Sequence, residues 1–415
     1  MRILHTADWH IGQTFYQYDR TFEHQQFLNW LVNTIAQKEI DVLIISGDIF
    51  DLSNPSAAAI KLFYSFLNDA AKVRPGLQII ITAGNHDSAA RLESPKPLLE
   101  SSNTHIIGMI ERKADGSIDY EKLVIPIKDK QGDIKLWCMA VPFLRMGDYP
   151  IAADNGTSYS EGVISLYKEV YDYTIAKKKT GQAILAMGHL HTLDAELSDH
   201  DETERMIMGG VEFIPVSAFN ENIIYTALGH IHKTQRMGKN GNVYYSGSPL
   251  PMSFSEVNYK HQVITFEIES EQVNNIQFLE IPVTIELLRV PPRSKPLADV
   301  LQELKQLPNA GEDISFAPYL EVKVLLEGPE PALRHKVETA IDGKNVRLAK
   351  IDVKYPKGSE NEDGEINTYD KLHELKPSDI FNKIYASRFK SETPVELTNL
   401  FNQVLQEVNS NENKS

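Results

Sequence analysis

The stretch IIITAGNHDSAA, residues 79–90, joins a strongly apolar run to three adjacent polar side chains. The isoleucine run is typical of a buried strand, and the glycine that follows it permits a sharp change of direction. Asn85, His86 and Asp87 come directly afterwards. Polar groups at the end of a buried strand cost free energy unless something binds them. The stretch therefore predicts a strand that ends at a binding or catalytic site.

The same arrangement recurs at four other predicted strands before residue 280. Each short run of apolar or β-branched residues is followed by a carboxylate, an amide or an imidazole. The five strand ends carry Asp8 and His10; Asp48 and Asp51; Asn85, His86 and Asp87; His189; and His230 and His232. In open α/β sheets, sites form beyond the carboxyl ends of the strands. We therefore expect these side chains to converge at the same end of one sheet.

The alternation of strands and helices up to about residue 280 predicts an α/β layered fold. Several strands are near-continuous apolar runs, which indicates that both faces of the sheet are covered. Helices are expected over 21–39 and 56–73, where apolar residues recur at three- and four-residue spacing. The chain of 415 residues is too long for one ordinary core, so two or three domains are expected.

The pattern changes after residue 280, where a β-α-β-α-β order predicts a small second domain over 281–355. An acidic, polar segment over 356–368 is typical of a linker. Two amphipathic helices are expected over 369–408, too short to bury their faces alone, so we expect a partner surface there. Residues 409–415 are expected to be a disordered tail.

The composition describes a globular chain with 42% hydrophobic and 24% charged residues. Apolar runs are of strand length, far below the roughly 20 residues of a membrane helix, and the N-terminus lacks a signal-peptide pattern. A cytoplasmic location is therefore expected. The single cysteine, Cys138, cannot form an internal disulfide and is expected to be buried in a strand.

The net charge of −15 argues mildly against a nucleic-acid-binding protein. The acidic excess is uneven, because residues 194–204 and 359–365 hold much of it. A metal site also needs carboxylates of its own. The overall charge therefore leaves nucleic-acid binding open.

The polar strand ends supply a set of oxygen and imidazole donors without a thiolate, which suits Mn, Fe or Zn. The seven candidate ligands are Asp8, His10, Asp48, Asn85, His189, His230 and His232. Seven ligands exceed the need of one tetrahedral ion but fit two ions if one carboxylate bridges them. Asp48 is the preferred bridge, because it lies centrally in chain order in a turn that contains glycine.

Each candidate ligand also has a purely structural interpretation. Asp8 and Asp48 could be helix N-caps, Asn85 could lie in a turn, and a lone histidine after a strand is usually structural. Taken together, the structural interpretation requires five unrelated coincidences at one end of a sheet. The metal interpretation is therefore favoured.

Five motifs carry a family resemblance: DWH (8–10), GDIFD (47–51), GNHD (84–87), GHL (188–190) and GHIH (229–232). In this order they resemble the calcineurin-like metallophosphoesterase superfamily. The surrounding sequence segments, such as TAGNHDSAARLE and YYSGSPLPMSFSE, resemble the SbcD family of bacterial nucleases. The resemblance covers about residues 1 to 260 and extends further by element order and size alone. It implies a four-layer α-β-β-α metallophosphoesterase sandwich over 1–280, with a small α+β capping domain and C-terminal helices.

The resemblance also implies roles for the site residues. One ion would take Asp8, His10, Asp48 and His232, and the other Asp48, Asn85, His189 and His230. The expected metal is manganese, with magnesium as the alternative. His86 matches the catalytic histidine of the family and would protonate the leaving oxygen. Asp87 is expected to cap a helix or brace the backbone, and Asp51 is a candidate supporting residue. His191 is expected to be a bystander. No firm role is assigned to Arg145, Ser246 and Ser248.

The activity implied by the resemblance is that of a metal-dependent DNA nuclease, a 3'-5' exonuclease on duplex ends and an endonuclease on hairpin or blocked ends. It would act as a dimer with an SbcC-type ATPase in DNA repair, replication and recombination, and the ATPase would bind residues 369–408. Phosphate contacts would come from isolated cations: Lys233, Arg236, Arg91 and Lys260.

Two alternatives remain at this stage. The same metal core could serve a phosphatase or a cyclic-nucleotide phosphodiesterase, although neither needs the extra domain and helices. The chain could also be a non-catalytic scaffold for the ATPase. A scaffold would be expected to have lost ligands, whereas all seven ligand positions and His86 are present.

Overall fold

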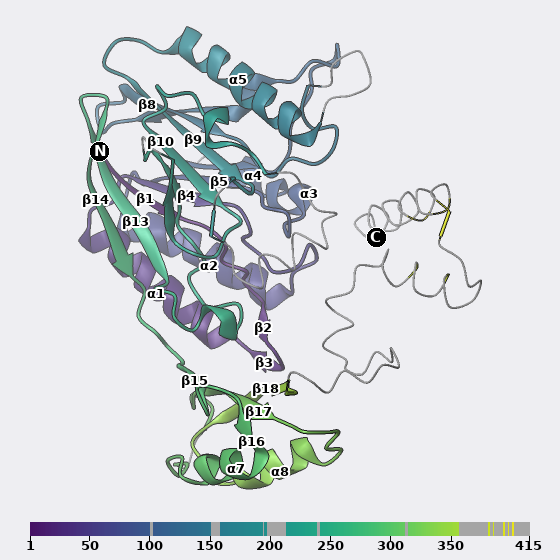
Figure 1. The fold of residues 1–415 in the computed structure, drawn as a ribbon. Helices are drawn as coiled ribbons and strands as arrows, with labels where there is room; N and C mark the ends of the chain where they lie inside the picture. Colours follow the sequence, from purple (N-terminus) through teal and green to yellow (C-terminus); the bar gives the residue numbers. More distant parts are fainter. Residues whose placement is uncertain are drawn as a thin grey trace. The chain divides into compact units, whose positions relative to one another are not determined.

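The computed structural model describes most of the chain up to residue 356 and six positions beyond it. The described residues are 1–99, 103–150, 158–193, 195–196, 213–238, 241–311, 314–356, and 381, 385, 393, 394, 397 and 401. Those up to Tyr355 belong to one compact unit (Figure 1). Nearly all of the predicted linker and C-terminal helices, and the whole predicted tail, lie outside the described residues.

Two six-stranded mixed sheets form the centre of this unit. The first sheet has the order β14 (Gln272–Glu280), β13 (Gln262–Glu269), β1 (Arg2–Thr6), β4 (Val42–Ser46), β5 (Gln78–Thr82) and β6 (Thr104–Ile107). The second has the order β11 (Gln235–Met237), β12 (Val243–Tyr245), β10 (Tyr225–Gly229), β9 (Ala183–His189), β8 (Ile134–Ala140) and β7 (Val124–Lys128). In the first sheet β1, β4, β5 and β6 run parallel, and β13 pairs antiparallel with both β1 and β14. In the second sheet β12, β10, β9 and β8 run parallel, and the edge strands β11 and β7 are antiparallel to their neighbours.

Alternate residues of the first sheet enter two different cores. Leu4, Leu43 and Ile79 lie side by side on β1, β4 and β5 and pack on the helix-covered face. Their neighbours Ile3 and Val42 belong to the core that the two sheets share. Both faces are buried, which explains why these strands are apolar at nearly every position.

Helices complete the outer layers. Helix α1 (Thr21–Gln37) and α2 (Ala57–Val73) cover the first sheet, and α5 (Tyr159–Lys177) covers the second (Figure 1). This arrangement confirms the four-layer α-β-β-α sandwich. Helix α5 was not predicted, although its N-terminus carries a capping box of Ser158 and Glu161 that the sequence displays.

Shorter elements connect these layers. They are β2 (Thr14–Phe15), β3 (Tyr18–Asp19), α3 (Ala89–Glu93), α4 (Lys96–Leu99) and the 3-10 turns η2 (Tyr120–Leu123), η3 (Val216–Ala218) and η4 (Phe254–Glu256). Cys138 lies buried in β8, as predicted, and burial raises the pKa of its thiol.

The five strands that end in polar residues belong to two sheets, so the expectation of a single sheet was wrong. Strands β1, β4 and β5 lie side by side in the first sheet, and β9 and β10 are neighbours in the second. Their ends meet because Ser46, the last residue of β4, bonds to both β9 and β10. An apolar strand face looks the same in sequence whether helices or a second sheet cover it, which is why the error arose.

A smaller parallel sheet follows in the chain, with the predicted β-α-β-α-β order. Its members are β15 (Leu287–Arg289), β16 (Lys295–Pro296), α7 (Leu297–Lys305), β17 (Tyr319–Leu325), α8 (Leu333–Ala340) and β18 (Arg347–Lys354). Val300 of α7 and Val337 of α8 are fully buried against β17. The short strand β16 is an addition to the predicted elements.

Buried polar contacts join this small sheet to the start of α1. The Tyr319 hydroxyl donates a 2.8 Å hydrogen bond to Glu23 Oε2, and Glu23 forms an ion pair with Arg20 at 2.7 Å. The Arg347 guanidinium lies 4.2 Å from the centre of the Tyr319 ring. Because Arg20, Glu23 and Tyr319 are all buried, these charges are held by each other rather than by water.

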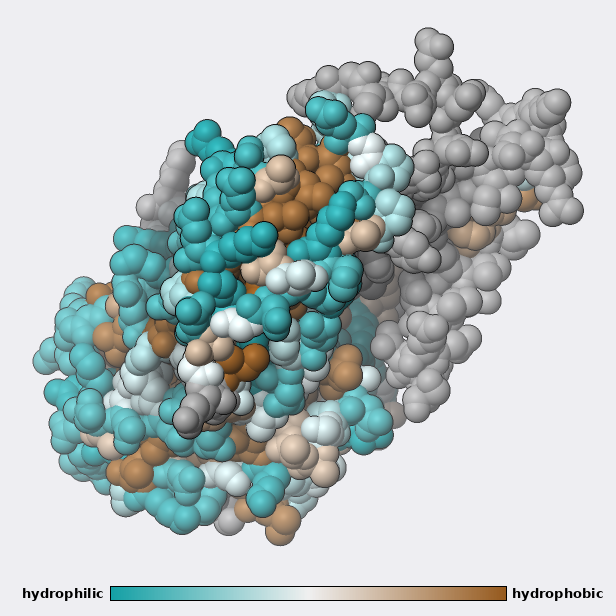
Figure 2. Space-filling view, turned by 90° about the horizontal axis from the view of Figure 1, so that it is seen from below, coloured by the Kyte–Doolittle hydropathy of each residue, from teal (hydrophilic) through white to brown (hydrophobic). Residues whose placement is uncertain are grey.

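The visible surface is mainly polar. On the face shown in Figure 2, hydrophilic residues predominate and surround smaller hydrophobic groups. Within the described ranges, no helix has the length and apolarity required to cross a membrane.

Tyr319→Phe is predicted to lower the free energy of unfolding by about 1.5 kcal/mol, because it removes a buried hydrogen bond to a charged group. Urea denaturation followed by circular dichroism measures the change. Tyr355→Phe is the matched control, since Tyr355 is 40% exposed. Equal effects of the two substitutions would contradict the prediction.

Candidate metal centre

The predicted site residues lie on loops that leave the strands at one edge of the paired sheets. The loop after β1 is bonded to the loop after β4, since Asp8 N donates to Gly47 O at 3.1 Å and His10 N donates to Asp48 O at 3.0 Å. A carboxylate links the two sheets, because Asp8 Oδ1 accepts a 2.8 Å bond from the backbone of His230. The fold thus brings together residues more than 200 positions apart.

Four of the seven predicted ligands adopt a left-handed backbone that non-glycine residues rarely use. The φ angles are +55° at Asp8, +45° at His10, +50° at Asp48 and +93° at His230. Such conformations cost roughly 1 kcal/mol or more each and persist where the surrounding structure imposes them. Their concentration at one site indicates that the fold holds these side chains in fixed directions.

Six of the predicted ligands are almost completely buried: Asp8, His10, Asp48, His189, His230 and His232. Asn85, His86 and Asp51 are half-buried. The centre therefore has a closed base of carboxylates and imidazoles and a more open rim.

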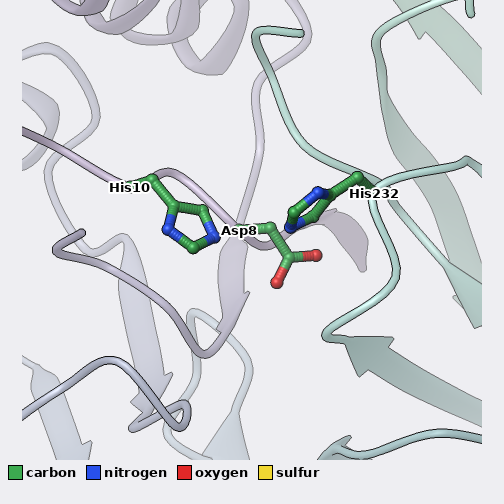
Figure 3. Close-up of side chains that lie close together, drawn as sticks. All are labelled: Asp8, His10 and His232. Atoms are coloured by element: carbon green, nitrogen blue, oxygen red, sulfur yellow. The ribbon is translucent and has the colours of Figure 1, made fainter. Parts of the chain in front are cut away.

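The first group of donors consists of Asp8, His10 and His232. One donor atom from each lies within 4.8 Å of the other two. Figure 3 shows the rings of His10 and His232 on either side of the Asp8 carboxylate. Donor atoms at this spacing can share one metal ion.

The second group consists of Asp48, His189 and His230, with the same 4.8 Å limit between donor atoms. Asn85 joins it, because its Oδ1 lies 2.9 Å from His189 Nε2. Asp48 also faces the first group, with Oδ2 3.5 Å from His10 Nε2. Its position between the two groups is the one that a bridging carboxylate requires.

The arrangement around His189 requires either a proton or a metal ion at Nε2. Its Nδ1 donates to the Ser46 carbonyl at 2.8 Å, which leaves Nε2 with a lone pair in the neutral ring. That nitrogen faces Asn85 Oδ1 at 2.9 Å and Asp48 Oδ2 at 3.2 Å, both of which are also acceptors. Three lone pairs can converge only on a proton or a metal ion.

Two carboxylate oxygens support the same conclusion. Asp8 Oδ2 and Asp48 Oδ2 are buried and accept no hydrogen bond within the part of the chain that the structure describes. A buried oxygen without a donor carries a desolvation penalty that a bound cation would remove. The residues present therefore fit a pair of divalent metal ions.

The pKa shifts follow from the same geometry. Burial opposes the charge on Asp48, but the facing imidazoles, His189 first, hold the pKa of Asp48 well below its usual value. Burial likewise acts against the proton on His189, yet the Asp48 carboxylate raises the pKa of that ring to about 9. Burial, the main cause, raises the pKa of Asp8 to about 6. Asp48 is thus the carboxylate that attracts positive charge most strongly.

The structural interpretation of the aspartates as helix caps does not hold. Asp48 Oδ1 accepts a bond from the backbone of His86 at 3.0 Å, and Asp8 bonds to His230. The N-cap of α2 is Ser56, and that of α1 is Arg20. Both aspartates therefore organise the loops of the centre.

Glycines permit the close approach of these loops. A Cβ atom at Gly84 would overlap the Asp48 carboxylate, and one at Gly47 would overlap the ring of His189. Gly47 also has a positive φ of +87°. A side chain at either position would displace a predicted ligand.

His86 lies at the rim with its orientation set by Asp51. The ring nitrogen Nδ1 lies 2.8 Å from the Asp51 carbonyl oxygen, which fixes the proton on Nδ1 in the neutral ring. Asp51 also places its carboxylate 3.3 Å from His10 Nδ1. Asp51 therefore contacts two imidazoles of the site. His86 further lies close enough to His10 and Asp48 to form a third group of donors.

Asp87 accepts three backbone hydrogen bonds, from Gly84, Ile49 and Phe50, at 2.9 to 3.1 Å. Burial, with the nearby charge of Asp48, raises the pKa of its carboxyl, whereas these bonds lower it. The side chain thus ties the loop after β5 to the loop after β4 and does not contact the His86 ring in any bond that the structure shows.

The remaining predicted positions differ in their surroundings. His191 is buried, with its ring centre 4.0 Å from that of His230. Ser248 N donates to the His232 carbonyl at 3.1 Å, and Ser246 is buried nearby. Arg145 is exposed.

Three of the four cations expected to contact phosphate interact with protein groups. Lys233 pairs with Glu196, Lys260 pairs with Glu280, and Arg236 donates to the Gly241 carbonyl at 2.8 Å. Arg91 is exposed on α3. These cations are scattered, as the sequence indicated, and form no dense basic patch among the described residues.

Phe143 is a residue of the centre that was not predicted. Its ring centre lies 6.2 Å from that of His189 and 6.3 Å from that of His230. It also lines a pocket of about 210 Å³ together with Gly84, Asp87 and Arg145. The only sign in the sequence that Phe143 belongs to the site was its place in the segment VPFLR. A single sequence does not distinguish this segment from an ordinary strand end.

Two family models match the chain. The model described as calcineurin-like phosphoesterase matches residues 1–234, and the model described as type 5 capsule protein repressor C-terminal domain matches residues 283–389. The first match contains every predicted metal ligand and His86.

The chain is also similar to curated proteins named as the SbcD component of the SbcCD nuclease. It is 33% identical to the protein of Rhodobacter capsulatus over 86% of this chain and 88% of that protein. Identity to the Escherichia coli K12 protein is 29%, over 84% of each chain, and to the Bacillus subtilis protein 30%, over 63% and 65%. The chain therefore belongs to the calcineurin-like phosphoesterase family and, within it, to the SbcD nucleases.

Proposed function

We propose that this chain is a DNA nuclease that depends on two divalent metal ions, manganese in preference to magnesium. It would degrade duplex ends as a 3'-5' exonuclease and open hairpin or blocked ends as an endonuclease. It would work with an SbcC-type ATPase in DNA repair, replication and recombination. The cytoplasm is the expected location, because the chromosomal DNA of bacteria lies there.

One observation carries this proposal: the buried oxygens Asp8 Oδ2 and Asp48 Oδ2, which accept no hydrogen bond from the described residues, lie among buried imidazoles from the ends of both sheets, next to a half-buried histidine. A set of donor atoms that is shielded from solvent can hold metal ions tightly. The more open rim formed by His86, Asn85 and Asp51 leaves access for a large substrate.

Asp8, His10, Asp48 and His232 would hold one ion, and Asp48, Asn85, His189 and His230 the other. When bound, two such ions polarise a phosphodiester and make a water molecule acidic enough to attack it. The rigid, left-handed backbone at Asp8, His10 and Asp48 would keep their donor atoms in place during the reaction.

His86 would supply the proton that the leaving sugar oxygen needs. Its Nδ1–H is occupied by the Asp51 carbonyl, so Nε2 is the atom that would carry and release the proton. The hydrogen bond from the His86 backbone to Asp48 Oδ1 would keep the ring at a constant distance from the ions. Asp51 would support His86 and His10, and Asp87 would support the loops.

We propose the same division of the chain that the sequence indicates. Residues 1–280 would form the nuclease domain and 281–355 the capping domain that helps to position DNA. Residues 356–368 would be a linker, 369–408 the segment that binds the ATPase, and 409–415 a disordered tail. Two copies of the chain would act as a dimer on DNA ends.

The rival enzyme class is a phosphatase or a cyclic-nucleotide phosphodiesterase. The deciding experiment compares hydrolysis of duplex and hairpin DNA ends with hydrolysis of bis-p-nitrophenyl phosphate and cyclic AMP, in manganese, with and without the ATPase. Faster turnover of the small esters than of DNA ends under all conditions would overturn the proposal. A wild-type chain that hydrolyses none of these substrates would support the scaffold alternative.

Asp48→Asn is predicted to reduce bound manganese from about two ions per chain to about one or fewer, because Asp48 supplies the charge shared by both positions. Elemental analysis after gel filtration measures the content. Asp69→Asn, on the exposed side of α2, is the matched control and should keep both ions. Full occupancy in Asp48→Asn would rule out a bridging role.

His86→Gln is predicted to reduce DNA cleavage by about 10²- to 10⁴-fold while manganese content stays at its wild-type level, since the proton donor is lost and the ligands remain. Cleavage of an end-labelled duplex and metal content are measured on the same preparation. His335→Gln, exposed on α8, serves as the control. Loss of metal in His86→Gln would instead assign His86 to the ligands.

Deletion of residues 366–415 is predicted to abolish binding to the ATPase and to spare manganese-dependent cleavage of single strands, because the metal centre lies entirely before residue 280. Pull-down with the ATPase and a nuclease assay measure the two properties. Deletion of 409–415 alone is the control and should preserve binding. An intact complex after the larger deletion would exclude the segment as the docking element.

A further inference from the structure

Glu256 is a buried carboxylate that is not among the predicted site residues. It is the last residue of the short turn η4 and of the sequence segment YYSGSPLPMSFSE. Only 1% of its surface is exposed. A charged group in such a position is costly unless it is paired and hydrogen-bonded, so its partners indicate its purpose.

The two oxygens of Glu256 have different surroundings. Oε2 accepts a 2.9 Å hydrogen bond from the backbone of Met252, which closes the turn. Oε1 accepts no hydrogen bond of standard geometry from the described residues and lies 3.5 Å from His232 Nδ1. The second oxygen is therefore directed at a predicted metal ligand.

Both partners are buried, with 1% of each residue exposed, so the Glu256 carboxylate faces the His232 ring rather than water.

This contact selects the tautomer of His232. With Nδ1 turned to a carboxylate, Nδ1 is the nitrogen on which a proton is favoured, and Nε2 would then keep its lone pair. Figure 3 shows one ring nitrogen of His232 turned toward Asp8 and the other turned away from it. The lone pair is consequently available on the side of the metal centre.

We propose that Glu256 is a positioning residue, which holds His232 in the Nδ1–H tautomer and strengthens the metal position formed by Asp8, His10, Asp48 and His232. The inference rests on the proposed function, because it requires that His232 binds a metal ion. It adds a residue outside the ligand set to that function.

The two metal positions are predicted to differ for this reason. The counterpart of His232 at the other position, His189, donates its Nδ1 proton to the neutral carbonyl of Ser46. A carboxylate partner makes the imidazole more basic than a carbonyl partner does, and partners of this kind change metal affinity by about 10- to 100-fold. Glu256 therefore acts on one position and leaves the other unaffected.

A rigid frame keeps Glu256 in place. Gln13 Nε2 lies 2.8 Å from Met252 Sδ, and Gln13 Oε1 accepts a 2.9 Å bond from Arg20. Arg20 also donates to the Pro251 carbonyl at 2.6 Å. The segment before Glu256 is thus fixed by a buried arginine, and rotation of the carboxylate away from His232 would break its bond to the Met252 backbone.

The test measures manganese binding to the full-length chain by titration calorimetry after removal of metal. Glu256→Gln keeps the shape of the side chain and an oxygen for the Met252 bond but loses the charge. One of the two manganese affinities is expected to fall by about 10- to 100-fold, and the other to change less than about twofold. Glu269→Gln, exposed at the end of β13, is the matched control and should leave both affinities unchanged.

The outcomes separate this inference from the proposed function. If the wild-type chain binds no manganese, the proposed function fails. If the wild type binds two ions and Glu256→Gln binds them equally well, only the role of Glu256 is overturned. An equal loss at both positions in a folded variant, checked by its melting temperature, also overturns it.

A second measurement applies even if Glu256→Gln does not fold. ¹⁵N NMR of the zinc-loaded wild-type chain with labelled histidine reports the protonated nitrogen of each ring, and the His232→Asn spectrum assigns the signal. We expect a protonated Nδ1 and an unprotonated Nε2 on His232. A proton on Nε2 would overturn the inference.

Discussion

The geometry of the candidate metal centre depends on the carboxylate of Asp48. Its Oδ1 accepts the backbone N–H of His86, while its Oδ2 faces His10 at 3.5 Å and His189 at 3.2 Å. Its own carbonyl holds the loop of His10. Asp48 thus fixes how far the two donor groups lie from each other and from His86 at the rim. Its left-handed backbone, with φ of +50°, is the conformational cost of this position.

Buried acceptors that lack donors carry a desolvation cost, and the protein bonds around the site remove only part of it. The bonds around the site, from Asp87 to three backbone amides and from Ser46 to His189, hold the loops but leave Asp8 Oδ2 and Asp48 Oδ2 without donors among the described residues. A bound cation would offset the desolvation cost of these two oxygens and thereby add to the stability of the folded chain. Rigidity of this kind favours a reaction in which positioning and charge neutralisation supply most of the catalysis.

The sequence alone predicted the α/β class, helices α1 and α2, and the element order of the small domain, because each depends on local periodicity. It also identified the ligand candidates, since polar residues directly after apolar strands are unusual enough to stand out. It did not predict α5, whose mixture of tyrosines and charges blurs its apolar face. Phe143 and Glu256 were missed because an aromatic or acidic residue carries no local sign of the ring that it will contact.

The sequence determined which chemical groups are available, namely oxygen and imidazole donors at five strand ends and a histidine beside one of them. Only the tertiary structure decided that these ends come from two sheets and meet across them. A buried parallel strand has the same hydrophobic pattern in its sequence whether a helix or a second sheet covers it. The local sequence therefore does not show which strands face each other across two sheets. The tertiary structure likewise decided what each donor faces: Asp48 between two groups, His86 against the Asp51 carbonyl, and Glu256 against His232. The bond between Asp8 and the backbone of His230 joins residues 222 positions apart in the chain, and only the folded chain brings them within bonding distance.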